Sequence, residues 1–129
     1  MSGGLKILRT MFMTRSIGTR YCRGDIWVAK FSYYEDPTQY KMRPVVIISN
    51  DMLNESDDVI ILAPITSARP RNDYDVVIDY WEDAGLDRAS CIRVSKLTSF
   101  HKTFLKVKIG TLQSTDLESV LHVASSMFV

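Results

Sequence analysis

The sequence of 129 residues has few of the residues from which specialised sites are built. Its two cysteines, Cys22 and Cys91, lie far apart without a histidine at ligand spacing, which excludes a zinc finger or zinc ribbon. No apolar run approaches the roughly 18–20 residues of a membrane span, and the N-terminus lacks the uninterrupted apolar stretch of a secretory signal. We therefore expect reduced thiols in a soluble, cytoplasmic protein that does not enter a membrane.

Common enzyme motifs are absent as well. The chain has no Gly-rich phosphate-binding loop, HExxH motif, G-x-S-x-G elbow or Rossmann glycine fingerprint. Its two histidines, His101 and His122, are distant in the chain, so a catalytic histidine pair is not favoured. The acidic residues between positions 73 and 87 form no compact ligand loop, and we interpret them as a solvated face. They are Asp73, Asp75, Asp79, Glu82, Asp83 and Asp87. No metal and no cofactor is expected.

Charge is distributed unevenly along the chain. Residues 1–24 contain five of the 16 basic residues and none of the 15 acidic ones, so they carry +5. The 11 basic and 15 acidic residues that remain give residues 25–129 a charge of −4. A protein that binds long duplexes through many phosphates needs a basic body, so the sequence favours a local patch that holds a short substrate.

The chain is long enough for one domain with its own core. Hydrophobic residues make up 46% of it. At this size roughly 65–70% of the surface of the unfolded chain is buried on folding, which requires no disulfides. Residues 1–21 are basic and lack a sustained period, so we expect a mobile N-terminal extension over residues 1–21 and a single domain over residues 22–129.

Short runs of β-branched and aromatic residues between polar turns predict a mainly β domain. About six strands are expected, over residues 25–31, 45–49, 59–63, 74–79, 90–94 and 105–109. Leu117, Val120, Leu121 and Ala124 follow at helical spacing, with a capping box over residues 115–118. The pattern predicts a C-terminal helix that covers the open side of a strongly curved sheet and closes a small barrel.

A polar and aromatic stretch over residues 33–42 is predicted to be a loop that leads to Arg43 and Pro44 at the start of a buried strand. Pro44 biases the residue before it toward an extended backbone, so Arg43 is held at a rigid point. This arginine is therefore a candidate for a functional site. The alternative is an ordinary surface arginine that pairs with Glu35 or Asp36.

A second candidate site follows the third predicted strand. Thr66 and Ser67 supply two hydroxyls at the strand end, and Arg69 and Arg71 flank Pro70 just beyond them. Hydroxyls and guanidinium groups both donate hydrogen bonds to phosphate oxygens, so this segment can form a phosphate cradle. Ordinary turn chemistry of a Thr-Ser pair is the alternative.

Three motifs together resemble the MazF/PemK toxin family of bacterial toxin–antitoxin systems. They are Gly24-Asp25-Ile26-Trp27, the Arg43-Pro44 motif with the apolar run to Ser49, and Ala63-Pro64-Ile65-Thr66-Ser67. The resemblance covers roughly residues 22–125. It implies an SH3-like barrel with helices, usually a homodimer, that acts as a metal-independent, sequence-specific endoribonuclease. In that family the arginine of the Arg-Pro motif and the threonine of the Ile-Thr motif carry the reaction, which implies catalytic roles for Arg43 and Thr66.

The implied reaction is cleavage of single-stranded RNA by its own 2′-hydroxyl, with a 2′,3′-cyclic phosphate and a 5′-hydroxyl as products. Arg43 would stabilise the negative charge that develops at phosphorus, and Thr66, supported by Ser67, would orient the reacting groups. Flanking phosphates would be bound by Lys41, Arg69, Arg71 and Lys96, and unpaired bases would stack on Tyr33, Tyr34 or Tyr40. A cognate antitoxin with a disordered tail is the implied protein partner.

The chain departs from the family pattern in two places. Relatives often have a glutamate five positions ahead of the arginine, where this chain has Thr38, so no role of a loop glutamate carries over. Ser95-Lys96 stands where some relatives have acidic or amide residues. Two alternative functions stay open: a non-catalytic barrel toxin that inhibits a protein target such as DNA gyrase, and an RNA-binding module that has lost turnover.

Overall fold

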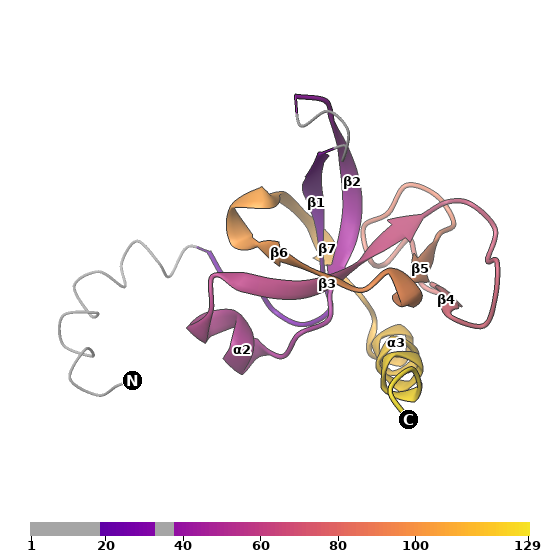
Figure 1. Ribbon diagram of the computed structural model, residues 1–129. Helices are drawn as coiled ribbons and strands as arrows, with labels where there is room; N and C mark the ends of the chain where they lie inside the picture. The colour runs from indigo at the N-terminus through magenta and orange to yellow at the C-terminus, as the bar shows by residue number, and fades with distance from the viewer. Residues whose placement is uncertain (1–18, 33–37) are drawn as a thin grey trace, which may run out of the picture.

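The computed structural model describes residues 19–32 and 38–129, which form a strongly bent antiparallel sheet followed by a C-terminal helix (Figure 1). The strands are β1 (Asp25–Ser32), β2 (Tyr40–Ile47), β3 (Val59–Thr66), β4 (Asp75–Val77), β5 (Cys91–Arg93), β6 (Thr98–His101) and β7 (Leu105–Thr111). The helices are α2 (Asp51–Ser56), the 3₁₀ turns η1 (Val94–Lys96) and η2 (Lys102–Phe104), and α3 (Ser114–Ser126). The prediction of a mainly β fold with a C-terminal helix is confirmed.

Strand β3 lies at the centre of the sheet. One of its edges pairs with β2, from Val45 opposite Pro64 to Ile47 opposite Leu62. Its other edge pairs first with β6 and then, at its last two residues, with β5. The order β4-β5-β3-β2-β1-β7 makes β4 and β7 the two ends of the sheet. Within the described residues no ladder joins these ends, so backbone hydrogen bonds do not close the predicted barrel.

Side chains that alternate across the sheet separate two apolar clusters. On the paired strands β1 and β2, Ile26 and Val46 belong to the first cluster, whereas Trp27 and Val45 belong to the second. Helix α3 packs on the first cluster and buries Val120 there completely. Burial of a side chain of this size contributes about 1.5–3 kcal/mol, so the apolar stripe of α3 holds the helix against the sheet as predicted.

The turn at residues 84–85 packs directly on the backbone of β7. A Cβ atom at Gly110 would lie 2.1 Å from the carbonyl oxygen of Ala84. A Cβ atom at Gly85, where φ is +93°, would lie 2.7 Å from the carbonyl oxygen of Ile109. Because glycine has no Cβ, the two backbones can approach this closely and enclose the first cluster, of which Ala84 is a buried member.

Three elements differ from those predicted. Strand β2 begins at Tyr40 and pairs with β1, so residues 40–42 are strand rather than loop, while residues 33–37 of that loop lie outside the described part. Strand β6 was not among the six predicted strands. Its sequence is mainly polar, and it forms through pairing with β3 rather than from its own pattern. Helix α2 was not predicted, because six residues are too few to show a helical period. Its N-cap is Asn50, whose side chain accepts the Leu53 N–H at 2.8 Å.

The capping box predicted over residues 115–118 is wrong. Helix α3 begins at Ser114, and Gln113 before it makes no side-chain capping bond. The Asp116 carboxylate is instead buried and accepts the backbone N–H groups of Asp79 at 3.1 Å and Tyr80 at 3.0 Å. A carboxylate in the first turn is also favoured by the helix dipole. Its partners at residues 79–80 are remote in sequence, so the residues around Asp116 do not predict this contact.

Part of the predicted N-terminal extension lies within the described residues. The Tyr21 ring stacks on Trp27 with centroids 5.0 Å apart, and Arg20 pairs with Glu55 at 3.7 Å. Residues 1–18 lie outside the described part. Among the helices that are described, none is long and apolar enough to cross a membrane.

Candidate functional site

Arg43 lies on β2 opposite Ala29 of β1, with an extended backbone, as the Arg-Pro sequence predicts. Its side chain is exposed, and its guanidinium has no hydrogen bond or ion pair with any residue that the structure describes. Glu35 and Asp36, the alternative partners, lie outside the described part. A rigid backbone thus holds a guanidinium that is not bonded to any described residue and can bind a ligand.

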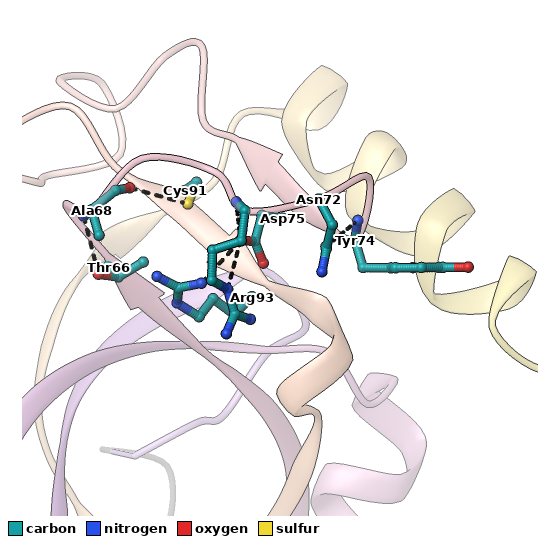
Figure 2. Close-up of polar contacts among 8 residues, drawn as sticks. Thr66, Ala68, Asn72, Tyr74, Asp75, Cys91 and Arg93 are labelled. Atoms are coloured by element: carbon teal, nitrogen blue, oxygen red, sulfur yellow. Dashed lines mark hydrogen bonds and ion pairs between the residues drawn. The ribbon is translucent and has the colours of Figure 1, made fainter.

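Thr66 is the last residue of β3 and pairs with Cys91 of β5. Its Oγ1 accepts the backbone N–H of Ala68 at 3.1 Å (Figure 2). The turn chemistry considered for the Thr-Ser pair is therefore present. It does not use the hydroxyl proton, so Thr66 can still donate one hydrogen bond to a ligand.

Arg43 and Thr66 project from the same face of the sheet. The β2–β3 ladder ends where Val45 lies opposite Pro64, and each candidate lies two residues beyond that pair on its own strand. Since side chains alternate with a period of two, both share the face of Val45 and Leu62, members of the second cluster. Beyond the last pair the strands diverge, β3 toward β5 and β2 toward its hairpin with β1 (Figure 1).

The other predicted site residues lie around the end of β3. Lys41 lies on β2, two residues before Arg43 and on the same face, and Ser67 and Arg69 follow Thr66 in the loop to β4. Lys96 ends η1, which connects the two strands that share one edge of β3. All four residues are exposed. Lys41, Arg69 and Lys96 form no ion pair with the described residues, so three cations near Arg43 can receive an anionic ligand.

Asp75 is a buried carboxylate, and its interpretation as part of a solvated acidic face is wrong. It is 6% exposed, and its Oδ2 accepts the backbone N–H of Arg71 at 2.7 Å, the Nε–H of Arg71 at 3.3 Å and the Nη1–H of Arg93 at 3.0 Å (Figure 2). Burial alone would raise the pKa of Asp75, but the hydrogen bonds from Arg71 and the charge of Arg93 outweigh it and lower the pKa. The carboxylate is therefore ionised near neutral pH.

Arg93 belongs to this group of residues although it is not among the predicted site residues. Cys91 pairs with Thr66, and Arg93 pairs with Asp75, so the alternation of β5 places Arg93 on the face that carries Thr66. The signal was present in the predicted strand over residues 90–94. There Arg93 lies between two buried apolar residues, Ile92 and Val94, which places its side chain on the opposite side of the strand from theirs.

Both cysteines are free thiols. Cys91 is 1% exposed beside Thr66, and its Sγ makes a weak hydrogen bond to the carbonyl oxygen of Ala68 at 3.6 Å. Burial, with a smaller contribution from the negative charge of Asp75, raises the pKa of the Cys91 thiol. Burial likewise raises the pKa of Cys22, assisted by Asp25. Neither cysteine has the lowered pKa of a nucleophilic thiolate.

The histidines do not form a pair on which catalysis could depend. His101 lies at the end of β6, and its Nδ1 accepts the backbone N–H of Thr103 at 3.2 Å to cap η2. His122 is exposed on α3. In the part of the chain that the structure describes, no three His, Cys, Asp or Glu side chains gather in a group that could hold a metal ion.

A pocket of about 250 Å³ lies between β1, β6 and η2. It is lined by Lys30, Ser99, Phe100, His101 and Phe104. Phe31, which lies opposite Lys41 in the β1–β2 ladder, packs on Phe100 with ring centroids 4.7 Å apart. The Lys30 ammonium lies 4.5 Å from the centre of the exposed Tyr40 ring. The pocket therefore combines aromatic faces with a cation.

Asp25, in the first of the three sequence motifs, has a structural role. It is 2% exposed and accepts the backbone N–H of Cys22 at 3.0 Å and the hydroxyl of Thr111 at 3.1 Å. Lys108 lies 3.4 Å from the same carboxylate. These contacts tie the start of β1 to the end of β7, which places β1 correctly beside β2.

Residues 22–128 match the family model described as PemK-like, MazF-like toxin of type II toxin-antitoxin system. The endoribonuclease MazF of Staphylococcus saprophyticus is 29% identical over 99 residues, covering 76% of this chain and 82% of that protein. The fold is similar to the Mycobacterium tuberculosis toxin MazF-mt6, with a TM-score of 0.66 at 20% identity over 81% of this chain and 95% of that one. An endoribonuclease in complex with its cognate antitoxin from a mycobacterial species gives a TM-score of 0.69 at 14% identity over 81% and 91% of the two chains.

The matched region contains all three motifs and every residue of the candidate site. It also begins one residue after the predicted N-terminal extension. The chain belongs to the PemK-like, MazF-like toxin family of type II toxin–antitoxin systems.

Proposed function

We propose that this protein is a sequence-specific endoribonuclease that cleaves single-stranded RNA, including mRNA, in the cytoplasm and without a metal ion. The observation that carries the proposal is the common sheet face of Arg43 and Thr66, one a cation and the other a hydroxyl, on neighbouring strands. The name of the Staphylococcus saprophyticus relative supports the same activity.

RNA contains its own nucleophile, so the protein need not supply one. The 2′-oxygen would attack the adjacent phosphorus while the bond from phosphorus to the 5′-oxygen breaks. The 2′-hydroxyl loses its proton and the 5′-oxygen gains one, which leaves a 2′,3′-cyclic phosphate and a 5′-hydroxyl. What the enzyme must contribute is alignment of the 2′-oxygen with the scissile bond and stabilisation of the extra negative charge at phosphorus.

Arg43 suits the second task because its guanidinium stays protonated at any physiological pH and its backbone is held by β1 and Pro44. Thr66 suits the first task. Its Oγ1 is oriented by the Ala68 N–H, and its proton is available to the 2′-hydroxyl or to a phosphate oxygen. The exposed hydroxyl of Ser67, next in the chain, would support it.

The neighbouring cations would hold the rest of the strand. Lys41, Arg69, Arg71 and Lys96 are assigned to flanking phosphates. The pocket between β1, β6 and η2 would receive an unpaired base, since rings such as the exposed Phe104 offer a stacking surface. A stack of this kind contributes about 1–3 kcal/mol per base. Tyr40 offers a further exposed ring beside Lys30, whereas Tyr33 and Tyr34 lie outside the described residues.

A cognate antitoxin is the proposed protein partner, and a homodimer is the proposed assembly. A structural relative is described as a complex with its cognate antitoxin, which supports the first assignment. A disordered antitoxin tail that carries acidic or apolar residues would compete with RNA for the cations around Arg43. Antitoxin that left RNA affinity unchanged would contradict this competition.

The direct test is to map cleavage ends on a long mixed-sequence RNA in EDTA, with the wild type and Arg43→Ala side by side. The proposal expects ends at a recurrent sequence for the wild type, with 5′-hydroxyl termini, and greatly reduced cleavage for the variant. Intact RNA together with stalled DNA gyrase would support a non-catalytic toxin instead. RNA binding without fragments, unchanged by Arg43→Ala, would support a module that has lost turnover.

A further inference from the structure

The loop between β3 and β4 contains three of the proposed RNA-binding residues, Ser67, Arg69 and Arg71, and is held at both ends by hydrogen bonds. At its beginning, the Thr66 hydroxyl accepts the N–H of Ala68. At its far end, Asp75 accepts the backbone N–H of Arg71 at 2.7 Å, and the Asn72 side chain accepts the N–H of Tyr74 at 2.9 Å (Figure 2). The Asp75 carboxylate therefore fixes the far end of this loop, at Arg71.

The two arginines that contact Asp75 are not equivalent. Arg93 has a side chain only 17% exposed, so it serves mainly as a buried counter-charge. The Arg71 side chain is 46% exposed and contacts the carboxylate only through Nε. Its two terminal amino groups have no partner among the described residues. One edge of the Arg71 guanidinium is thus bound to protein and the other edge is open.

An open guanidinium edge with a fixed plane matches the oxygens of a phosphate. The bond between Asp75 and the Nε of Arg71 removes the rotational freedom that an exposed arginine would otherwise lose on binding RNA. Strand pairing places Val77, Cys91 and Thr66 side by side on three adjacent strands, about 10 Å from the first to the third, and Asp75 lies about 7 Å further along β4. A phosphate bound at Arg71 would therefore flank the scissile phosphate rather than be the scissile one.

We propose that Asp75 is a positioning residue that fixes Arg71 as a two-pronged binding group for an RNA phosphate that flanks the scissile phosphate. This inference rests on the proposed endoribonuclease function and adds to it a residue that contacts no substrate itself. The Asp75 carboxylate also pairs with two arginines, so the group of Asp75, Arg71 and Arg93 has a net charge of +1, which favours binding of RNA.

The test is a double-mutant cycle on a short RNA that contains the mapped cleavage sequence. Arg71→Lys keeps the charge but has neither Nε nor a planar fork, and Asp75→Asn keeps the size but loses the charge that orients the fork. Each single variant is expected to lower kcat/KM about tenfold or more, mainly through a higher KM. The double variant should be no worse than either single one, because both remove the same interaction.

The matched control is Arg69→Lys, in the same loop and without an ion pair to the described residues. Its loss should add to that of Asp75→Asn, because Asp75 does not hold Arg69. A merely structural role of Asp75 would make its loss additive with Arg71→Lys as well, and that result overturns the inference. Activity of Arg71→Lys equal to that of the wild type also overturns it.

Thermal unfolding of each variant shows whether the fold persists. If Asp75→Asn does not fold, Asp75→Glu replaces it in the cycle, since it keeps the charge and displaces the carboxylate by one methylene, and the same non-additivity is expected. Wild-type protein that leaves the RNA intact removes the proposed function and this inference with it. Wild-type cleavage with additive losses overturns only the role of Asp75.

Discussion

The guanidinium of Arg43 and the hydroxyl of Thr66 leave neighbouring strands on the same face of the sheet, two residues beyond the last pair of the β2–β3 ladder. This relationship follows from strand register, because antiparallel pairing brings together residues that the chain separates by a helix and a strand. The proposed reaction needs a cation and a hydroxyl near one phosphate, and the register supplies both.

Arg43→Ala should lower kcat for RNA cleavage by about 10²–10³, the usual effect of removing one charge-stabilising donor from a reacting centre. Single-turnover cleavage of a short RNA measures it. Arg20→Ala is the matched control, because Arg20 is an exposed arginine that pairs with Glu55 of α2. Equal losses in the two variants would contradict a special role of Arg43.

Thr66→Val should reduce cleavage strongly, whereas Thr66→Ser should keep most of the activity. Valine has the shape of threonine but neither accepts the Ala68 N–H nor donates to the RNA, while serine retains both functions. Initial rates for the two variants, compared with their thermal unfolding midpoints, separate the loss of the hydroxyl from a loss of fold. Similar rates for valine and serine would exclude the hydroxyl from the reaction.

The free energy of unfolding should fall as the pH drops below about 4, in part because of Asp75. The folded protein lowers the pKa of this carboxyl below its ordinary value of 3.8, through Arg71 and Arg93 and against the effect of burial. The folded state therefore gains stability above the unfolded pKa and loses it as Asp75 is protonated. Denaturant unfolding from pH 2.5 to 7 measures this slope, which should be shallower in Asp75→Asn than in the wild type.

Asp116→Asn should destabilise the fold by about 1.5–3 kcal/mol without changing the chemistry of the site. The carboxylate accepts two backbone N–H groups of residues 79–80 and holds that turn on α3, and hydrogen bonds to a charged group contribute about this much. Glu118→Gln, an exposed change on the same helix, is the control and should shift stability by less than about 0.5 kcal/mol. Urea unfolding distinguishes the two.

Gly110→Ala should prevent normal packing of the turn at residues 84–85 on β7. The new Cβ would lie 2.1 Å from a backbone oxygen, a contact that only backbone movement relieves, and overpacking of this kind costs about 1–3 kcal/mol or more. Alanine at exposed Gln113, just beyond β7, should have little effect. A Gly110→Ala variant with wild-type thermal stability would show that the turn is free to shift.

Much of the site could be predicted from the sequence. Arg43 is on a rigid strand because Pro44 follows it, and Thr66 ends a strand because its apolar run gives way to polar residues, and both signals are local. Asp75 was misassigned because a carboxylate in a run of acidic residues looks solvated until its partners are known. Arg93 was missed for the same reason, since its role comes from a partner 18 residues away.

The sequence alone determined the β-rich fold and the C-terminal helix, because these depend on side-chain periodicity, which acts over a few residues. Arg43 and Thr66 became candidates through Pro44 and a strand end, and their proposed roles came from the resemblance to the MazF/PemK family. The tertiary structure decided that Arg43 and Thr66 share a face, that Asp75 is buried between two arginines, and that Asp116 holds a turn 36 residues away instead of capping its helix. A buried carboxylate needs its compensating donors, and which donors reach it depends on strand register and loop packing, which local sequence does not encode.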